Sequence, residues 1–228
     1  NNLTITPNGS DKIDSINGNA TISTENAALT LVYADSTRGW LNVNDSTTVE
    51  GAEFIAATGG TITTVCTNFK VHTFTGPGTF QVTAGGGPLA VVDYLVIAGG
   101  GGGGNAQGTG SGGAGGGAGG YRASGFGPSP LQGSSLFLGR GDFTVTIGAG
   151  GSAGQAGPVS PCALTKGQNG TDSSVATITS TGGGGGAGRC SQGGNPGGSG
   201  GGGNVPCKGS GNTPPTDPPQ GNDGGGRS

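Results

Sequence analysis

The chain has 228 residues, of which 58 are glycine and only 9% carry a charge, and its formal net charge at pH 7 is −3. A chain with so much glycine and so few large apolar residues departs from the composition of an ordinary enzyme. Disorder driven by charge repulsion requires a high net charge, which is absent here. Nine Lys and Arg residues provide no basic surface for nucleic acid, and no apolar run is long enough to span a bilayer.

Glycine is distributed unevenly along the chain. Residues 1–98 contain 11 Gly and 26 Leu, Ile, Val or Phe, whereas residues 99–228 contain 47 Gly and 13 of those apolar residues. The change near Gly99 indicates a domain boundary. We expect a short β module, a β-strand domain, a glycine-rich domain and a Pro/Gly-rich tail, at residues 1–49, 50–98, 99–212 and 213–228 respectively.

The first 98 residues favour short β-strands. Apolar and polar residues alternate in short runs, with turn residues such as Asn17-Gly18 between them, and no run has a helical period. Val91–Ile97 is almost wholly apolar, so we expect a strand covered on both faces. Strands this short bury little surface alone, which favours a homotrimer with a shared core. The predicted strands lie at residues 3–6, 21–23, 29–31, 40–43, 61–65, 69–74, 79–83 and 91–97.

Beyond Gly99, glycine occupies nearly every third position. An extended left-handed helix has three residues per turn, so these glycines lie on one face and allow close packing against a neighbouring helix. This pattern predicts packed polyglycine II helices, and the alternative is a disordered glycine-rich tail. The recurring positions are Gly101, Gly104, Gly110, Gly113, Gly116 and Gly119, then Gly148, Gly151, Gly154 and Gly157, then Gly182, Gly185, Gly188, Gly194, Gly197, Gly200 and Gly203.

Connectors with more varied side chains interrupt these tracts. We expect strands at Phe143–Ile147 and Val175–Thr179 and longer connectors around them. Rigid tracts that hold variable loops at one end make a binding surface. Thr213–Gln220 contains four prolines, so we interpret it as a stiff linker or loop rather than as a core element.

The sequence provides no catalytic, cofactor or metal site. Gly148–Ala153 fits a dinucleotide fingerprint, but no helix can follow it, because the next residues are rich in Gly and Pro. His72 is the single histidine and lies on a predicted strand, no nucleophile elbow is present, and the carboxylates are scattered. The cysteine spacings lack the close pairs of a zinc site. We therefore expect no enzyme activity.

Two sets of residues remain as candidates for function or stabilisation. Large side chains in the connectors could contact a receptor or fill gaps between glycine helices. A disulfide could offset the poor core of the glycine-rich half, and free thiols are the alternative. The receptor-contact candidates are Tyr121, Arg122, Phe126 and Phe137, and the disulfide candidates are Cys162, Cys190 and Cys207.

The chain contains Val92–Ala98 followed by six glycines, Tyr121-Arg122, Phe143–Gly151, and Asn169–Ser174 with the glycine tract after Thr181. Together these segments resemble glycine-rich domains of bacteriophage tail and virion proteins. Leu3–Ser10 and the residues up to Trp40 resemble a short β module of phage fibre proteins. The four cysteines and the proline-rich tail depart from this pattern.

The resemblance implies a polyglycine sandwich similar to that of T-even-type tail-fibre adhesins, whose distal loops touch the host receptor. It implies a virion or extracellular location, with other virion proteins and a host surface glycan or outer-membrane protein as partners. Many copies on one particle would strengthen weak contacts. Two alternatives stay open: a structural filament or capsid decoration without a receptor, and a secreted ice-binding or matrix protein.

Overall fold

The computed structural model describes residues 3–22, 29–43, 50–51, 53–67, 69–86, 89–105, 112–125, 127–155, 165–188, 193–204 and 207–226. These residues form short β-strands and extended segments without any α-helix, so the predicted all-β class is confirmed. The chain divides into two compact units. Unit 1 comprises Asn1–Gly59, Phe80–Val92 and Leu136–Asp142, and unit 2 comprises Gly60–Thr79, Asp93–Ser135 and Phe143–Ser228.

The N-terminal part of unit 1 contains two small antiparallel sheets. Strands β1 (Leu3–Ile5), β2 (Ala20–Ile22) and β5 (Glu50–Gly51) form one sheet, and β3 (Leu31–Asp35) pairs with β4 (Gly39–Asn42) in a hairpin. The core is small. Its largest fully buried side chain, Ile13, is 2% exposed and forms bridges with Ile16 and Trp40.

The remainder of unit 1 pairs segments that are far apart in the sequence. Strand β6 (Glu53–Thr58), which the alternation did not predict, is antiparallel to β9 (Gly78–Gly86), and β10 (Val91–Val92) is antiparallel to β14 (Leu136–Phe137). The side chains of Phe80, Val82, Ala90 and Leu138 are buried around these pairs.

Unit 2 holds the other strands. A hairpin consists of β7 (Thr61–Val65) and β8 (Phe69–Thr73), and a sheet consists of β11 (Leu95–Ile97), β12 (Tyr121–Ser124) and β13 (Gln132–Gly133). Strand β15 (Gly141–Thr146), which enters unit 2 at Phe143, pairs with β16 (Ser173–Val175), and β16 pairs with β17 (Ile178–Ser180).

Two strand predictions are wrong for local reasons, and a third, 29–31, overlaps β3 only at Leu31. Val91–Ile97 breaks after Val92, because the Ser124 hydroxyl donates to the Asp93 carboxylate at 2.9 Å and accepts from the Tyr94 amide at 3.0 Å. Neither are both faces covered, since Leu95 is 60% exposed. Residues 175–179 form a hairpin turn rather than one strand, with Ala176 at φ 50°.

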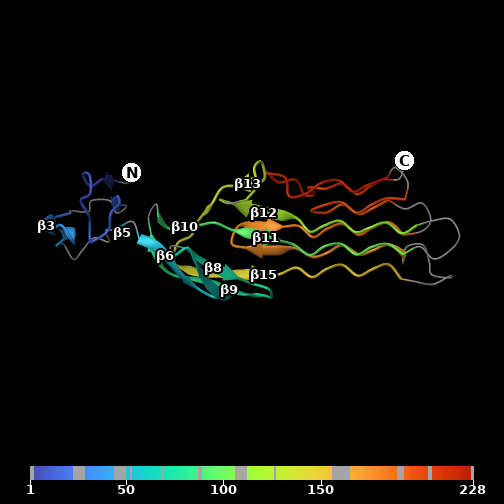
Figure 1. Cartoon of the computed structure of the whole chain (residues 1–228), viewed down its shortest axis with the longest axis horizontal. Helices are drawn as coiled ribbons and strands as arrows, with labels where there is room; N and C mark the ends of the chain where they lie inside the picture. The colour runs from blue at the N-terminus through green and yellow to red at the C-terminus, as the bar shows by residue number, and fades with distance from the viewer. Residues whose placement is uncertain are drawn as a thin grey trace. The chain divides into compact units, whose positions relative to one another are not determined.

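Most of unit 2 is a bundle of extended glycine-rich segments, which we call the glycine bundle. Its segments run side by side away from the strands of unit 2 (Figure 1). Amide N–H groups of Ala98, Gly101 and Gly104 donate to the carbonyls of Gly120, Gly117 and Ala114, at 2.8–3.1 Å. The bundle comprises residues 98–105, 112–120, 148–155, 165–172, 181–188, 193–198, 199–204, 207–213 and 220–226.

Within a segment, residues spaced by three form a row that faces one neighbouring segment. Different rows of the same segment form hydrogen bonds with different neighbours. The amides of Gly99, Gly102 and Asn105 form a second row that donates to Thr171, Gln168 and Thr165. The carbonyls of Gly100 and Gly103 accept bonds from Gly151 and Gly154. An extended helix with three residues per turn produces this repeat, so the predicted polyglycine II packing is confirmed.

The glycines are required because neighbouring backbones approach too closely for a side chain. A Cβ at Gly182, Gly183, Gly184, Gly185 or Gly186 would overlap backbone atoms of a neighbouring segment, and all five are buried. In 148–155, only the row Gly148, Gly151 and Gly154 is blocked in this way, and Ala149, Ser152 and Ala153 lie between them. The number of glycine rows thus reflects how many sides of a segment are covered: 181–188 is central and 148–155 is peripheral.

The prediction that Thr213–Gln220 is not a core element is wrong at Gln220. This side chain is 2% exposed; its Oε1 accepts from the Thr181 amide at 2.8 Å, and its Nε2 donates to the Pro214 carbonyl at 3.0 Å. The carbonyls of Asn222 and Gly225 accept bonds from Gly200 and Gly203. Residues 220–226 are therefore part of the glycine bundle.

Replacement of Gly184 by Ala is expected to destabilise the protein by about 3 kcal/mol, because the methyl group meets only backbone: the Asn195 carbonyl and the Gly201 amide nitrogen, the latter at 2.8 Å. The matched variant Gly150→Ala has its nearest atom at 3.7 Å and is expected to stay within about 1 kcal/mol of the unsubstituted chain. Urea unfolding of both variants measures the difference. Equal stability of the two would contradict this packing.

Candidate functional site

The hydrogen-bond register brings many segment ends together at one end of the glycine bundle. Asn105 donates to Thr165 at 2.7 Å, Ala114 to Ala187 at 2.9 Å, and Gly203 to Gly225 at 2.9 Å. We call this the loop end, and it is formed by residues 104–105, 112–114, 154–155, 165–167, 186–188, 193–194, 202–204, 207 and 224–226. In the sequence these ends are joined by residues 106–111, 156–164, 189–192 and 205–206, which lie outside the described residues.

The structure describes three of the four receptor-contact candidates, and they belong to two different units. Tyr121 and Arg122 lie on β12, half-buried and paired with Ile97 and Val96 of β11. Eight residues at roughly 3.1 Å each separate Gly120 from Gly112, so this strand end is about 25 Å from the loop end. Phe137 is 71% exposed on β14 of unit 1, and Phe126 is outside the described residues. A receptor contact by any of them stays a prediction.

The cysteine prediction concerns the loop end. Cys207 is an exposed free thiol, and its carbonyl accepts a bond from the Gly194 amide at 3.0 Å. Cys162 and Cys190 lie outside the described residues, so a disulfide among the three stays a prediction. Cys66 is also an exposed free thiol and follows β7.

A groove of about 600 Å³ lies on the glycine bundle beside the loop end. Its lining comes from three segments and contains no charged side chain, so main-chain atoms dominate it. Sequence reasoning missed the groove, because motif patterns describe side chains and this surface has almost none. The lining residues are Gly112, Gly113, Ala114, Gly115, Gly116, Gly200, Gly202, Gly203, Asn204, Gly224, Gly225 and Gly226.

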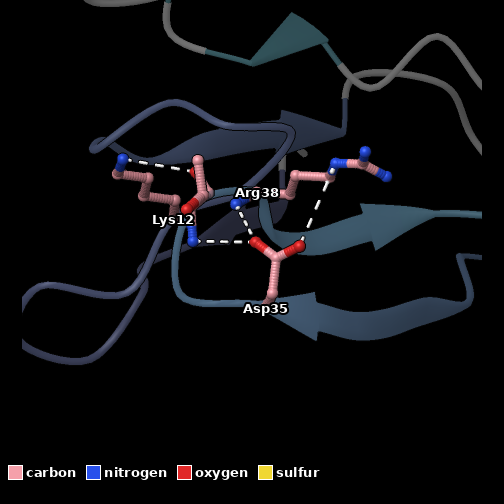
Figure 2. Close-up of polar contacts among 4 residues, drawn as sticks. Lys12, Asp35 and Arg38 are labelled. Carbon is pink, nitrogen blue, oxygen red and sulfur yellow. Dashed lines mark hydrogen bonds and ion pairs between the residues drawn. The ribbon is translucent and has the colours of Figure 1, made fainter.

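Three charged residues of unit 1, Lys12, Asp35 and Arg38, take part in polar contacts at the turn between β3 and β4. Figure 2 shows the Asp35 carboxylate accepting hydrogen bonds from the amides of Arg38 and Thr37, at 2.7 and 2.8 Å. The Arg38 side chain is 4.0 Å away, and Lys12 Nζ donates to the Thr37 carbonyl at 3.3 Å. These amide bonds, the one from Arg38 first, hold the pKa of Asp35 below its usual value of 3.8. We assign this cluster to turn stabilisation, since the charged side chains of Lys12, Asp35 and Arg38 all have partners within it.

The remaining candidate chemistry has structural explanations. Gly148–Ala153 is a segment of the glycine bundle rather than a strand-to-helix turn, and His72 pairs with Ile62 across the β7–β8 hairpin. Within the described ranges, no group of three or more His, Cys, Asp or Glu side chains could hold a metal ion. Nor does any helix in the described part of the chain have the length and apolar character needed to cross a membrane.

Because Asp35 has a lowered pKa in the folded state, its contribution to stability is present above the unfolded-state pKa and is lost as the pH falls through the folded-state value. Asp35→Asn keeps an oxygen acceptor for the two amides but removes the charge, so it is expected to flatten this part of the pH dependence. NMR titration of the Asp35 carboxyl carbon, with urea unfolding across the same acidic range, tests the assignment. A midpoint at or above 3.8 would contradict it.

A family model described as a glycine-rich domain matches residues 74–228, which is more than half of the chain. No curated protein matches the chain. No solved structure matches it either.

Proposed function

The chain belongs to the glycine-rich domain family, and we propose that it is a structural protein of a phage virion appendage, such as a tail fibre or spike, which attaches to the host cell surface by non-catalytic binding. The observation that carries this proposal is the loop end of the glycine bundle. It combines a backbone fixed by hydrogen bonds with connecting segments of varied sequence.

A fixed scaffold with variable loops suits recognition. The bonds at 2.7–3.1 Å hold each segment end in register with its neighbours, so loops attached there start from fixed positions. Binding residues are found disproportionately on such loops, because the scaffold tolerates their substitution. In the sequence, residues 106–111 and 189–192 include Gln, Thr, Ser and Arg, whereas Gly182–Gly186 is pure glycine. The proposed ligand is a host surface glycan or outer-membrane protein.

Unit 1 supports assembly of several copies. Phe54 is 75% exposed, Leu3 60% and Val32 50%, although the unit has few buried apolar side chains. Exposed apolar side chains on a domain with a small core can be buried by association with further copies. We therefore keep the homotrimer as part of the proposal, with other virion proteins as neighbours. Several copies on one particle would raise the effective concentration of weak binding sites.

A structural filament or capsid-decorating protein, without a receptor, is the second candidate function. The groove beside the loop end favours it, because a surface lined by glycine backbone suits association with a further glycine-rich segment. This alternative predicts self-association without saturable binding to cells.

The test is adsorption of the fluorescently labelled chain to a panel of Gram-negative strains. The proposal predicts saturable binding to at least one strain. Replacement of residues 156–164 by a Gly/Ser segment of equal length is expected to weaken this binding at least about tenfold, which corresponds to 1.4 kcal/mol. The strand-end variant Arg122→Ala tests the other candidate contact in the same assay.

Circular dichroism and urea unfolding check that both variants stay folded. Loss of binding in Arg122→Ala alone would move the contact to the strand end, as the sequence candidates suggest. Absence of saturable binding to every strain would contradict host attachment and favour the structural filament.

A further inference from the structure

The segment 199–204 has one set of backbone groups without a partner. A polyglycine II helix has three N–H rows and three C=O rows, which point in six directions around its axis. The amides of Gly202, Gly201 and Gly203 donate to Gly115, Asn195 and Gly225, so all three N–H rows are used. The carbonyls of Gly202 and Gly201 accept bonds from Ala187 and Gly209, so two C=O rows are used.

The unused row consists of the carbonyls of Gly200 and Gly203. Neither carbonyl accepts a bond within the described part of the chain, although both residues are buried and both line the groove. Buried carbonyls are nearly always paired, and an unpaired one costs stability. The floor of the groove therefore presents two acceptors, spaced by three residues.

The walls of the groove present donors with the same spacing. In 112–120, the amides of Ala114, Gly117 and Gly120 point to segment 181–188. Successive rows turn by about 120°, which directs the amides of Gly112 and Gly115 toward the groove. In the opposite wall, the Gly224 amide donates to the Gly209 carbonyl. The same 120° rotation therefore directs the amide of the next residue, Gly225, toward the groove. None of the three groove amides donates to another described residue.

We propose that the groove binds an extended glycine-rich segment supplied by a second copy of this chain. Such a segment would donate to the carbonyls of Gly200 and Gly203 and accept from the amides of Gly115 and Gly225. It would thereby fill the sixth position around segment 199–204, whose other five positions are filled by segments of the same kind. The proposal goes beyond host attachment and does not depend on it.

The chemistry of the groove selects this occupant. Elsewhere in the bundle, a Cβ at Gly194, Gly200 or Gly201 would overlap a neighbouring backbone, so a segment bonded at this spacing needs glycine in its contact rows. The chain itself contains many suitable segments, and the groove lacks charged side chains, so the net charge of −3 on each copy does not place like charges there.

The experiment is sedimentation equilibrium of the full chain over a range of concentrations, with two groove variants and one control. Gly115→Gln and Gly225→Gln project side chains into open space, since no atom lies within 4 Å of either added Cβ, so both should fold. Gly150→Gln, whose added Cβ is 3.7 Å from the Gly100 carbonyl oxygen, is the matched control away from the groove.

We expect the mass of the unsubstituted chain and of Gly150→Gln to rise with concentration. Both groove variants are expected to lose at least about tenfold in the association constant, because two or more backbone hydrogen bonds are lost. A synthetic peptide with the sequence of residues 112–120 should compete with the association. A mass independent of concentration, or association unchanged by the peptide and by both groove variants, would overturn the proposal. Adsorption to cells is a separate readout, so failure of one proposal leaves the other testable.

Discussion

Close hydrogen bonding between glycine backbones is the interaction on which the rest of this structure depends. In an ordinary domain, burial of apolar side chains offsets the entropy lost on folding, but this chain has few large apolar residues to bury. Unit 2 instead satisfies its backbone groups through hydrogen bonds between segments, and glycine is required where a neighbouring backbone lies too close for a Cβ atom. The central segment 181–188 shows this most clearly, because its amides from Thr181 to Ala187 all have partners.

The three-residue repeat was predictable because the same geometry that forms the bonds also excludes Cβ atoms. The spacing of the glycines therefore indicates which residues face a neighbouring segment. As expected, a Cβ atom at Gly101, Gly116 or Gly151 would overlap the backbone of a neighbour. Gln220 was not predictable, since its burial depends on Thr181, 39 residues away. The break after Val92 was missed for the same reason: Ser124 replaces a strand bond from a distant position. The groove has no side-chain signature at all.

The arrangement of the bundle also explains why the proposed function is binding. Side chains polar enough for chemistry act as local structural groups: Asn169 accepts from the Gly185 amide at 2.9 Å, and Asp172 from the Gly182 amide at 2.8 Å. These side-chain oxygens accept hydrogen bonds from amides of the central segment that donate to no backbone carbonyl of the described residues. The proposals for recognition and association therefore rest on the hydrogen-bonded loop end and on the uncharged backbone groove.

Residue-resolved amide hydrogen exchange by NMR tests the backbone lattice most directly. In 98–105, the amides of Gly100 and Gly103 should exchange fast, whereas those of Gly99, Gly101, Gly102 and Gly104 should be protected. In 181–187 every amide should be protected, because each has a partner. Uniform fast exchange in both segments, or protection without a three-residue repeat in 98–105, would contradict the lattice.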